Sequence, residues 1–305
     1  MDEKDREIPG PLKKEMISFN DYCRKIFGEK IYKISLNAGF SCPNRDGTKG
    51  SRGCIFCSEG GSGDFAQSLC ISVSEQIEQA KQQVADKYQG TRYIAYFQAF
   101  TNTYGEPKRL REIFLPIAER DDIVAIDIAT RPDCLGEEVL EVLKEIKEKK
   151  PVIVELGLQT IHEKTINYIR RAYENREYEE AVVKLNDLEI HIVTHVILGL
   201  PGETKEDMVE TVKYVVQHKS SGIKLQLLHV LKGTDLAVDY EAGMFEVLSL
   251  DAYMDILKAC VAEIPEEMVV HRLTGDGPKK LLVAPLWSGD KKRVLNRINK
   301  EIWKK

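Results

Sequence analysis

Three cysteines near the start of the chain have the residue type and spacing of ligands to an iron–sulfur cluster. Cys42 precedes Cys54 by twelve positions, and Cys57 follows three positions later. Three thiolates can bind a [4Fe–4S] cube and leave its fourth iron without a protein ligand, whereas a fourth thiolate would close the site. An open iron can bind and activate another molecule. The spacing therefore indicates a cluster that takes part in chemistry.

Other uses of these thiolates explain less of the pattern. Structural zinc needs four ligands, usually two closely spaced pairs, and only Cys54 and Cys57 form such a pair. His162, His191 and His195 are remote in sequence, although a barrel could bring one near. Redox chemistry at the Cys-x-x-Cys pair would leave Cys42 unexplained. A fourth thiolate could come from residue 70, thirteen positions beyond Cys57, but that cysteine stands just before a predicted helix cap.

The remaining composition is ordinary for a soluble globular protein. The chain has seven cysteines, an odd number that argues against a disulfide framework. Cys23, Cys134 and Cys260 are expected to be small residues of the core or surface. No apolar run reaches about 18 residues, and the charged N-terminus does not have the form of a secretory signal. We therefore expect a cytoplasmic protein with no membrane contact.

Alternating strand and helix patterns must position the cysteine loop. The predicted strands span residues 30–36, 93–97, 123–128, 152–158, 191–198 and 223–230. The predicted helices span residues 72–88, 107–119, 136–149, 164–188 with a break near 173–176, 205–218 and 250–262. Such apolar strands fit a parallel sheet covered by helices, and a right-handed series of six βα units closes fully or partly into a barrel. We expect one domain over residues 1–305, with a core at about 29–263 and a C-terminal extension at about 264–305.

Polar residues follow each of the six predicted strands. The cysteine loop follows the first strand, and the others are followed by residues 98–103, 130–133, 159–162, 200–204 and 232–235. In a βα barrel the catalytic side lies at the carboxyl ends of the strands. These segments therefore predict one site around the cysteines.

Several stretches together resemble the radical S-adenosylmethionine (SAM) superfamily. More narrowly, they resemble its YtqA/YhcC-type group, which is related to the catalytic subunit of Elongator. The cysteine spacing is longer than the usual C-x3-C-x2-C of the superfamily. The matching stretches span about residues 20–290: Ser-Cys42-Pro-Asn-Arg-Asp-Gly, Gly53-Cys-Ile-Phe-Cys57, Tyr96-Phe-Gln-Ala-Phe-Thr-Asn-Thr-Tyr104, Glu155-Leu-Gly-Leu-Gln-Thr160, His195-Val-Ile-Leu-Gly-Leu-Pro-Gly-Glu-Thr204, Leu225-Gln-Leu-Leu-His229 and His271-Arg-Leu-Thr-Gly-Asp276.

The resemblance implies a fold and two cofactors. The fold would be an α/β partial (β/α)6 TIM-like barrel of radical SAM type with short N- and C-terminal extensions. Cys42, Cys54 and Cys57 would hold a [4Fe–4S] cluster whose open iron chelates SAM. Reductive cleavage of SAM would give a 5′-deoxyadenosyl radical that abstracts a hydrogen atom, while the protein binds, orients and excludes water.

The resemblance also implies contacts to the methionine and ribose parts of SAM. Thr101 and Asn102 stand where the superfamily usually has Gly-Gly-Glu, and their oxygens could accept from the methionine ammonium. Thr130, Gln159 and Arg171 occupy positions that contact the ribose and the methionine carboxylate in related enzymes. An arginine suits a carboxylate because its fork binds at two points, although Arg171 could also be a surface residue.

Further contacts are expected around the adenine. Phe56 could pack beside the cluster or against the base. His195 sits where relatives often carry a ribose-binding acid, although a core histidine is an equal alternative. Ile197, Gly199 and Leu200 are expected to line the adenine site. The resemblance assigns no residue to proton transfer.

The substrate implied by the resemblance is a uridine at the wobble position of transfer RNA. The reaction would convert 5-carboxymethylaminomethyl(2-thio)uridine to 5-aminomethyl(2-thio)uridine, which a separate methyltransferase could then use. A reducing partner such as flavodoxin or ferredoxin would supply the electron. Candidate substrate contacts are His229, Lys232, His271, Arg272 and Asp276.

The charge distribution is compatible with RNA binding, although the overall charge of −5 does not by itself indicate an RNA-binding protein. Residues 289–305 contain seven lysines and arginines against Asp290 and Glu301, a local charge of +5. This segment has the pattern of an amphipathic helix with an apolar face of Val294, Leu295, Ile298 and Ile302. It could be a solvated helix docked on the domain or a surface that contacts phosphates.

Two other functions remain open from the sequence. A radical SAM enzyme acting on a small metabolite would not bind RNA in a salt-dependent manner. A non-catalytic iron–sulfur or zinc module that binds RNA or protein would not cleave SAM after reduction.

Overall fold

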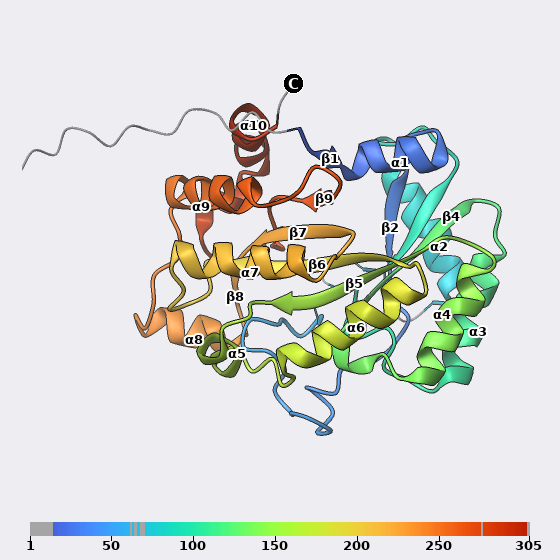
Figure 1. The fold of residues 1–305 in the computed structure, drawn as a ribbon, viewed down its shortest axis with the longest axis horizontal. Helices are drawn as coiled ribbons and strands as arrows, with labels where there is room; N and C mark the ends of the chain where they lie inside the picture. The colour runs from blue at the N-terminus through green and yellow to red at the C-terminus, as the bar shows by residue number, and fades with distance from the viewer. Residues whose placement is uncertain (1–14, 62, 64–65, 68–70, 276, 304–305) are drawn as a thin grey trace, which may run out of the picture.

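The computed structural model describes residues 15–303 except 62, 64–65, 68–70 and 276. Its central feature is a parallel sheet curled into a half-barrel (Figure 1), in the order β1-β9-β7-β6-β5-β4-β3-β2. The strands are β1 (Ile17–Ser18), β2 (Tyr32–Leu36), β3 (Tyr93–Phe97), β4 (Ile123–Thr130), β5 (Val152–Gln159), β6 (His191–Leu198), β7 (Gly222–Leu227) and β9 (Val269–Arg272). All of their described pairings are parallel. The predicted partial barrel is thereby confirmed.

Helices connect the strands and pack on the outer face of the sheet (Figure 1). They are α1 (Phe19–Phe27), α2 (Val73–Val84), α3 (Pro107–Ala118), α4 (Glu137–Lys147), α5 (Glu163–Tyr168), α6 (Asn175–Asp187), α7 (Lys205–Gln217), α8 (Asp235–Glu241), α9 (Leu250–Ala262) and α10 (Lys291–Glu301). The predicted capping box is present at α2, where Ser72 and Glu75 each accept from the other's backbone N–H. Within the described ranges, no helix combines the length and apolarity needed to cross a membrane.

The structure extends the sheet beyond the predicted core of residues 29–263. β1 pairs with β9, and β9 pairs with β7, so residues near both ends complete the sheet. A separate antiparallel pair is formed by β8 (Val230–Leu231), which follows β7 in the chain, and β10 (Leu282–Ala284), which follows β9. These short elements carry too few residues for a periodic pattern. The assignment of the whole chain to one domain stays a prediction.

The concave face of the sheet is polar, unlike the apolar layers that fill a closed TIM barrel. Ile34, Ile126 and Val154 belong to the apolar core that also contains side chains from the outer helices. Glu155, directly after Val154 in β5, lines a cavity instead, and in β2 the wall of this cavity includes both Lys33 and Ile34. In β5 the alternation of side chains thus separates a packed outer layer from an open interior.

Candidate active site

A cavity of about 700 Å³ opens inside the half-barrel and at the carboxyl ends of its strands. Its wall includes all three cysteines of the loop after β2. It also includes residues at or beyond the ends of β3 to β7, among them Gln98, Thr101, Thr130, Gln159, Ile197 and His229. Of the six segments predicted to form one site, four therefore contribute to this wall, whereas no residue of the segments 200–204 and 232–235 lines it.

Short-range contacts shape the cysteine loop. The backbone N–H of Cys57 donates to the Cys54 carbonyl at 3.0 Å, which forms the turn between the paired thiols. Gly53 has φ +73°, and a Cβ there would come within 2.9 Å of Arg45 Nε. Arg45 in turn donates from Nη2 to the Cys57 carbonyl at 3.0 Å. A glycine is therefore needed before Cys54 for both conformation and space.

Asn44 connects the cysteine loop to the segment after β5. Its side chain is buried, and its Nδ2 donates to the Arg170 carbonyl at 2.5 Å. The same Nδ2 lies 3.5 Å from Cys54 Sγ and donates to it. Ile55 continues the connection, since its N–H donates to the Ile169 carbonyl at 3.1 Å. The thiols thus sit on a loop held at both sides of Cys54.

The thiols fit an iron–sulfur cluster better than a single metal ion. Around one tetrahedral zinc, thiolate sulfurs would lie about 3.8 Å apart. Among the described residues, only His162, Asp207 and Glu210 form a group whose ligand atoms all lie within 4.8 Å. The three cysteines are spaced more widely than that. Burial, with a smaller contribution from the neighbouring Cys57, raises the pKa of Cys54 to about 12.

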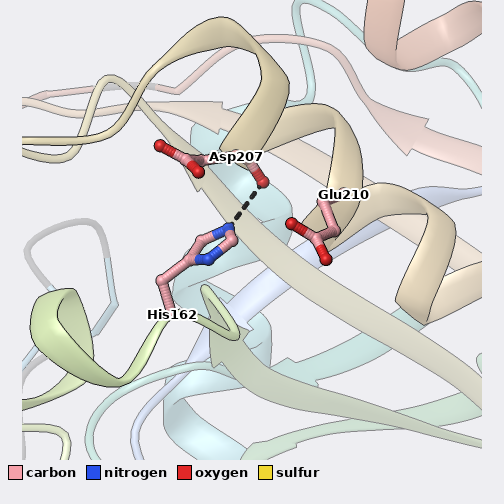
Figure 2. Close-up of side chains that lie close together, drawn as sticks. All are labelled: His162, Asp207 and Glu210. Carbon is pink, nitrogen blue, oxygen red and sulfur yellow. Dashed lines mark hydrogen bonds between the residues drawn. The ribbon is translucent and has the colours of Figure 1, made fainter.

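Figure 2 shows that His162 is directed toward helix α7. Its Nε2 donates to the Asp207 backbone carbonyl at 2.8 Å. The Asp207 carboxylate accepts from the Thr204 N–H at 2.7 Å, as part of the α7 cap, and Glu210 is exposed. These groups order the first turn of α7. His162 is therefore not a zinc partner of the cysteine loop.

Glu155 is the centre of a buried polar cluster inside the half-barrel. Its carboxylate accepts from Lys33 Nζ at 3.0 Å, Lys224 Nζ at 2.6 Å and the Tyr96 hydroxyl at 2.8 Å. His195 Nε2 lies 2.7 Å from the same group. Burial alone would raise the pKa of Glu155, but Lys224 and Lys33 hold that pKa well below its usual range. Glu155 therefore points into the half-barrel as a buried ion-pair partner of Lys33 and Lys224.

Both ring nitrogens of His195 are engaged in this cluster. Gln226 donates from Nε2 to His195 Nδ1 at 2.9 Å, so the proton lies on Nε2 and is donated to Glu155. Burial and the Lys224 charge lower the pKa of His195, which keeps the ring neutral. His195 faces the cavity, but a ribose contact would have to use the ring edge or displace one partner.

The expected SAM contacts divide into two groups. Seven of them line the cavity: Phe56, Thr101, Thr130, Gln159, Arg171, His195 and Ile197. Three described residues stand apart from its wall. Asn102 is fully buried and donates to the carbonyls of Phe97, Ala99 and Ala129. Its amide N–H groups thus hold the backbone of this turn, while its Oδ1 is buried without a hydrogen-bond partner among the described residues, so the predicted contact to the methionine ammonium stays a prediction.

Gly199 and Leu200 lie just behind the wall. Gly199 has φ +89°, and a Cβ there would meet Leu248 at 2.8 Å. Leu200 is buried in a small apolar cluster with Ile55 and Ile169. The close approach predicted at Gly199 is therefore to another side chain of the protein, and Ile197 alone of the three reaches the cavity.

Arg171 is fully engaged by the protein. Its Nη1 donates to the carbonyls of Leu158 at 2.9 Å and Thr160 at 2.7 Å. Its Nε and Nη2 donate to the Tyr173 carbonyl, and Nη2 also donates to Asn175 Oδ1 at 2.8 Å. Because these contacts use all five N–H donors, none remains for a SAM carboxylate. The side chain is buried, not on the surface.

Some of the candidate substrate contacts line the cavity and others do not. His229, His271 and Arg272 line the cavity, whereas Lys232 is exposed and is not part of its wall. Asp276 lies outside the described residues. Sequence analysis missed Lys33, Tyr96 and Lys224. The signal was present as charged residues within otherwise apolar strands, such as Ile-Lys224-Leu in β7.

The other cysteines largely match expectation. Cys23 and Cys260 are fully buried in apolar clusters. Cys134 is partly buried, and burial raises the pKa of its thiol to about 12. Cys70 lies outside the described residues.

Two family models match the chain. One, described as the Radical SAM superfamily, covers residues 46–215, and one, described as the Radical_SAM C-terminal domain, covers residues 220–304. The first match begins after Cys42, which is consistent with the unusual length of the cysteine loop.

Several known proteins are similar. The "Uncharacterized protein YtqA" of Bacillus subtilis is 46% identical over 285 residues, which cover 93% of this chain and 88% of that protein. "Protein YhcC" of Escherichia coli is 36% identical over 277 residues, covering 90% and 88%. A "tRNA uridine(34) acetyltransferase" of Methanocaldococcus jannaschii is 24% identical over 163 residues, covering 52% of this chain and 30% of that protein.

Among solved structures, the Elp3 of Methanocaldococcus infernus has a TM-score of 0.64 at 16% identity. The match covers 88% of this chain and 63% of that one. At this identity the likeness concerns the fold alone.

Proposed function

Because this chain belongs to the radical SAM superfamily, and is an enzyme that uses SAM and a [4Fe–4S] cluster, we propose that its substrate is a wobble uridine of transfer RNA. The reaction is the conversion of 5-carboxymethylaminomethyl(2-thio)uridine to 5-aminomethyl(2-thio)uridine. A relative named for uridine 34 of tRNA supports the choice of substrate class.

The observation that carries this proposal is the single cavity that joins the cysteines to His229, His271 and Arg272. Its volume of about 700 Å³ lies within the range of sites for small molecules and nucleosides. The cysteines mark one end, so SAM would occupy that end and a nucleoside the remainder. A nucleoside flipped out of an RNA loop can enter such a pocket while the rest of the RNA stays outside.

The residues of the chain have separable roles in this scheme. When bound, the reduced cluster and SAM supply a 5′-deoxyadenosyl radical that abstracts a hydrogen atom from the substrate. Phe56 and Ile197 provide apolar wall beside the cysteines, and Thr101 and Thr130 provide hydroxyls. These groups would bind SAM and keep water from the radical.

Lys224 lines the cavity and forms an ion pair with the Glu155 carboxylate. Burial lowers the pKa of Lys224 to about 8, against the opposing pull of Glu155 and with a contribution from Lys33. Its Nζ lies beside the Tyr96 hydroxyl, at 3.5 Å. A flavodoxin or ferredoxin would supply the electron, a separate methyltransferase could use the product, and both proteins would meet this enzyme in the cytoplasm.

Nucleoside mass spectrometry of transfer RNA tests the proposal. A strain lacking this protein should accumulate the carboxymethylaminomethyl uridine and lose the aminomethyl form. The wild-type gene should restore the profile, whereas a gene encoding Cys54→Ala should not. An unchanged nucleoside profile in the deletion strain would contradict the proposed substrate.

A further inference from the structure

We propose that residues 268–300 form the surface on which the RNA backbone docks, an inference that rests on the proposed tRNA substrate. This segment contains eight lysines and arginines and two acidic residues, a net charge of 8 − 2 = +6. The rest of the chain has 36 basic and 47 acidic residues, a net charge of −11. Such an asymmetry steers a polyanion toward one part of an otherwise acidic protein.

The basic segment borders the cavity. Arg272, Pro278 and Lys291 are part of the cavity wall, so the segment runs along one side of its opening. Lys279 and Lys280 follow Pro278 and are exposed. The Lys232 N–H donates to the Leu281 carbonyl at 2.8 Å, which brings an exposed lysine from the β7–α8 region beside this pair. The cations are therefore placed where phosphates flanking a bound nucleoside would lie.

Helix α10 holds its basic residues in two different settings. Val294, Ile298 and Ile302 are buried, and they fix the helix against the domain. Arg297 lies on that inner side, where it pairs with Asp251 at 2.5 Å and Glu301 at 2.8 Å. Lys292, by contrast, is exposed. The contacts of α10 with the domain thus use Arg297, whereas Lys292 and Arg293 lie on the exposed side of the helix.

The apolar face of α10 differs from the expectation at one position. Leu295 is 37% exposed and does not belong to the buried stripe. Just before the helix, Leu286 is 75% exposed, more than any other large apolar side chain of the described residues. An apolar side chain among cations is suited to contact a ribose or base next to a phosphate.

These features favour RNA over an anionic membrane. A helix that binds a membrane surface presents a broad apolar face, but the apolar stripe of α10 is already buried in the domain. The remaining surface presents exposed lysine and arginine side chains together with the exposed Leu286. Such a surface contacts a phosphate backbone, and its affinity should fall steeply with salt.

The test is the salt dependence of tRNA binding to the reconstituted protein. In the double variant Lys292→Glu/Arg293→Glu, both substitutions lie on the exposed first turn of α10. We expect roughly tenfold weaker binding at about 0.15 M salt, and a slope of log K against log salt reduced by about two units. Iron content and melting temperature should not change, because the altered side chains are exposed.

A matched variant controls for overall charge. Lys108→Glu/Lys144→Glu makes the same charge change on α3 and α4, which Figure 1 places away from α10. It should bind tRNA with nearly the wild-type affinity and salt slope. Equal affinity and slope for the α10 variant and the wild type would overturn the docking surface alone. Failure of the wild-type protein to bind any tRNA would instead overturn the proposed function, and the docking surface with it.

Discussion

The side-chain amide of Asn44 contacts both the predicted cluster ligand Cys54 and the backbone of the segment after β5. Its Nδ2 donates to Cys54 Sγ and to the Arg170 carbonyl. Hydrogen bonds to cluster sulfurs stabilise the more negative, reduced state and so set the reduction potential. Since SAM cleavage begins with that reduction, Asn44 is expected to influence how readily the enzyme is activated.

Replacing Asn44 with leucine should lower the midpoint potential of the cluster. The leucine keeps the approximate side-chain shape but removes the N–H donor, so the reduced cluster loses stabilisation, on the order of tens of millivolts. A redox titration followed by electron paramagnetic resonance measures the change. Asn186→Leu, at an exposed position on α6, is the control and should leave the potential unchanged. A wild-type potential in Asn44→Leu with full iron content would rule out this role.

The connection between β5 and α6 is the element that joins the cavity wall to the outer helices. Arg170 and Ala172 have φ of 56° and 60°, so the chain turns sharply there. The buried Arg171 between them donates to carbonyls on both sides of the turn. The guanidinium thus takes the place that a regular helix would fill with backbone hydrogen bonds.

Arg171→Met should therefore destabilise the fold before it affects SAM binding. The substitution leaves several buried carbonyls without donors, at about 1–3 kcal/mol each before relaxation, and a total loss of roughly 2–4 kcal/mol is expected. Urea denaturation measures this loss. Arg176→Met is the control, since its pair with Glu180 is exposed and screened by solvent and should contribute little to stability. Unchanged stability together with weaker SAM binding would instead assign Arg171 to the carboxylate of SAM.

The elements of this fold differ in how far their sequence could predict them. The six strands β2 to β7 have apolar runs and flanking turns, so their existence followed from local pattern. β1 has only two residues, and it exists because Ile17 and Ser18 find partners in β9. The break in the long predicted helix lies at residues 169–174, slightly before the expected 173–176, because Arg171 stabilises a turn there.

The site residues also differ in whether the local sequence could predict them. The cysteines are close in sequence, so their spacing alone indicated shared chemistry. Glu155 draws its partners from positions 122 residues earlier and 69 residues later. Only the curvature of the sheet brings Lys33 and Lys224 to it, and no local pattern reports that curvature. Likewise, Arg171 and Asn102 donate their N–H groups to nearby backbone carbonyls, and a sequence motif does not show where those carbonyls lie.

At the scale of the whole molecule, charge and shape are arranged around one opening. The cysteines lie at the strand ends, the buried Glu155 cluster forms the interior wall, and the basic C-terminal segment borders the entrance. The protein is acidic elsewhere. This arrangement suits an enzyme that holds a reactive cofactor inside and a polyanionic substrate outside.

The most direct test measures iron and 5′-deoxyadenosine in protein reconstituted without oxygen. The wild-type chain should bind about four irons and form 5′-deoxyadenosine when SAM and dithionite are supplied. Cys42→Ala, Cys54→Ala and Cys57→Ala should each abolish the product, because each removes one of the three thiolates. Cys23→Ala and Cys260→Ala, at buried positions away from the cavity wall, should retain it. Product formation that survives loss of Cys42, Cys54 or Cys57 would contradict a cluster held by these three residues.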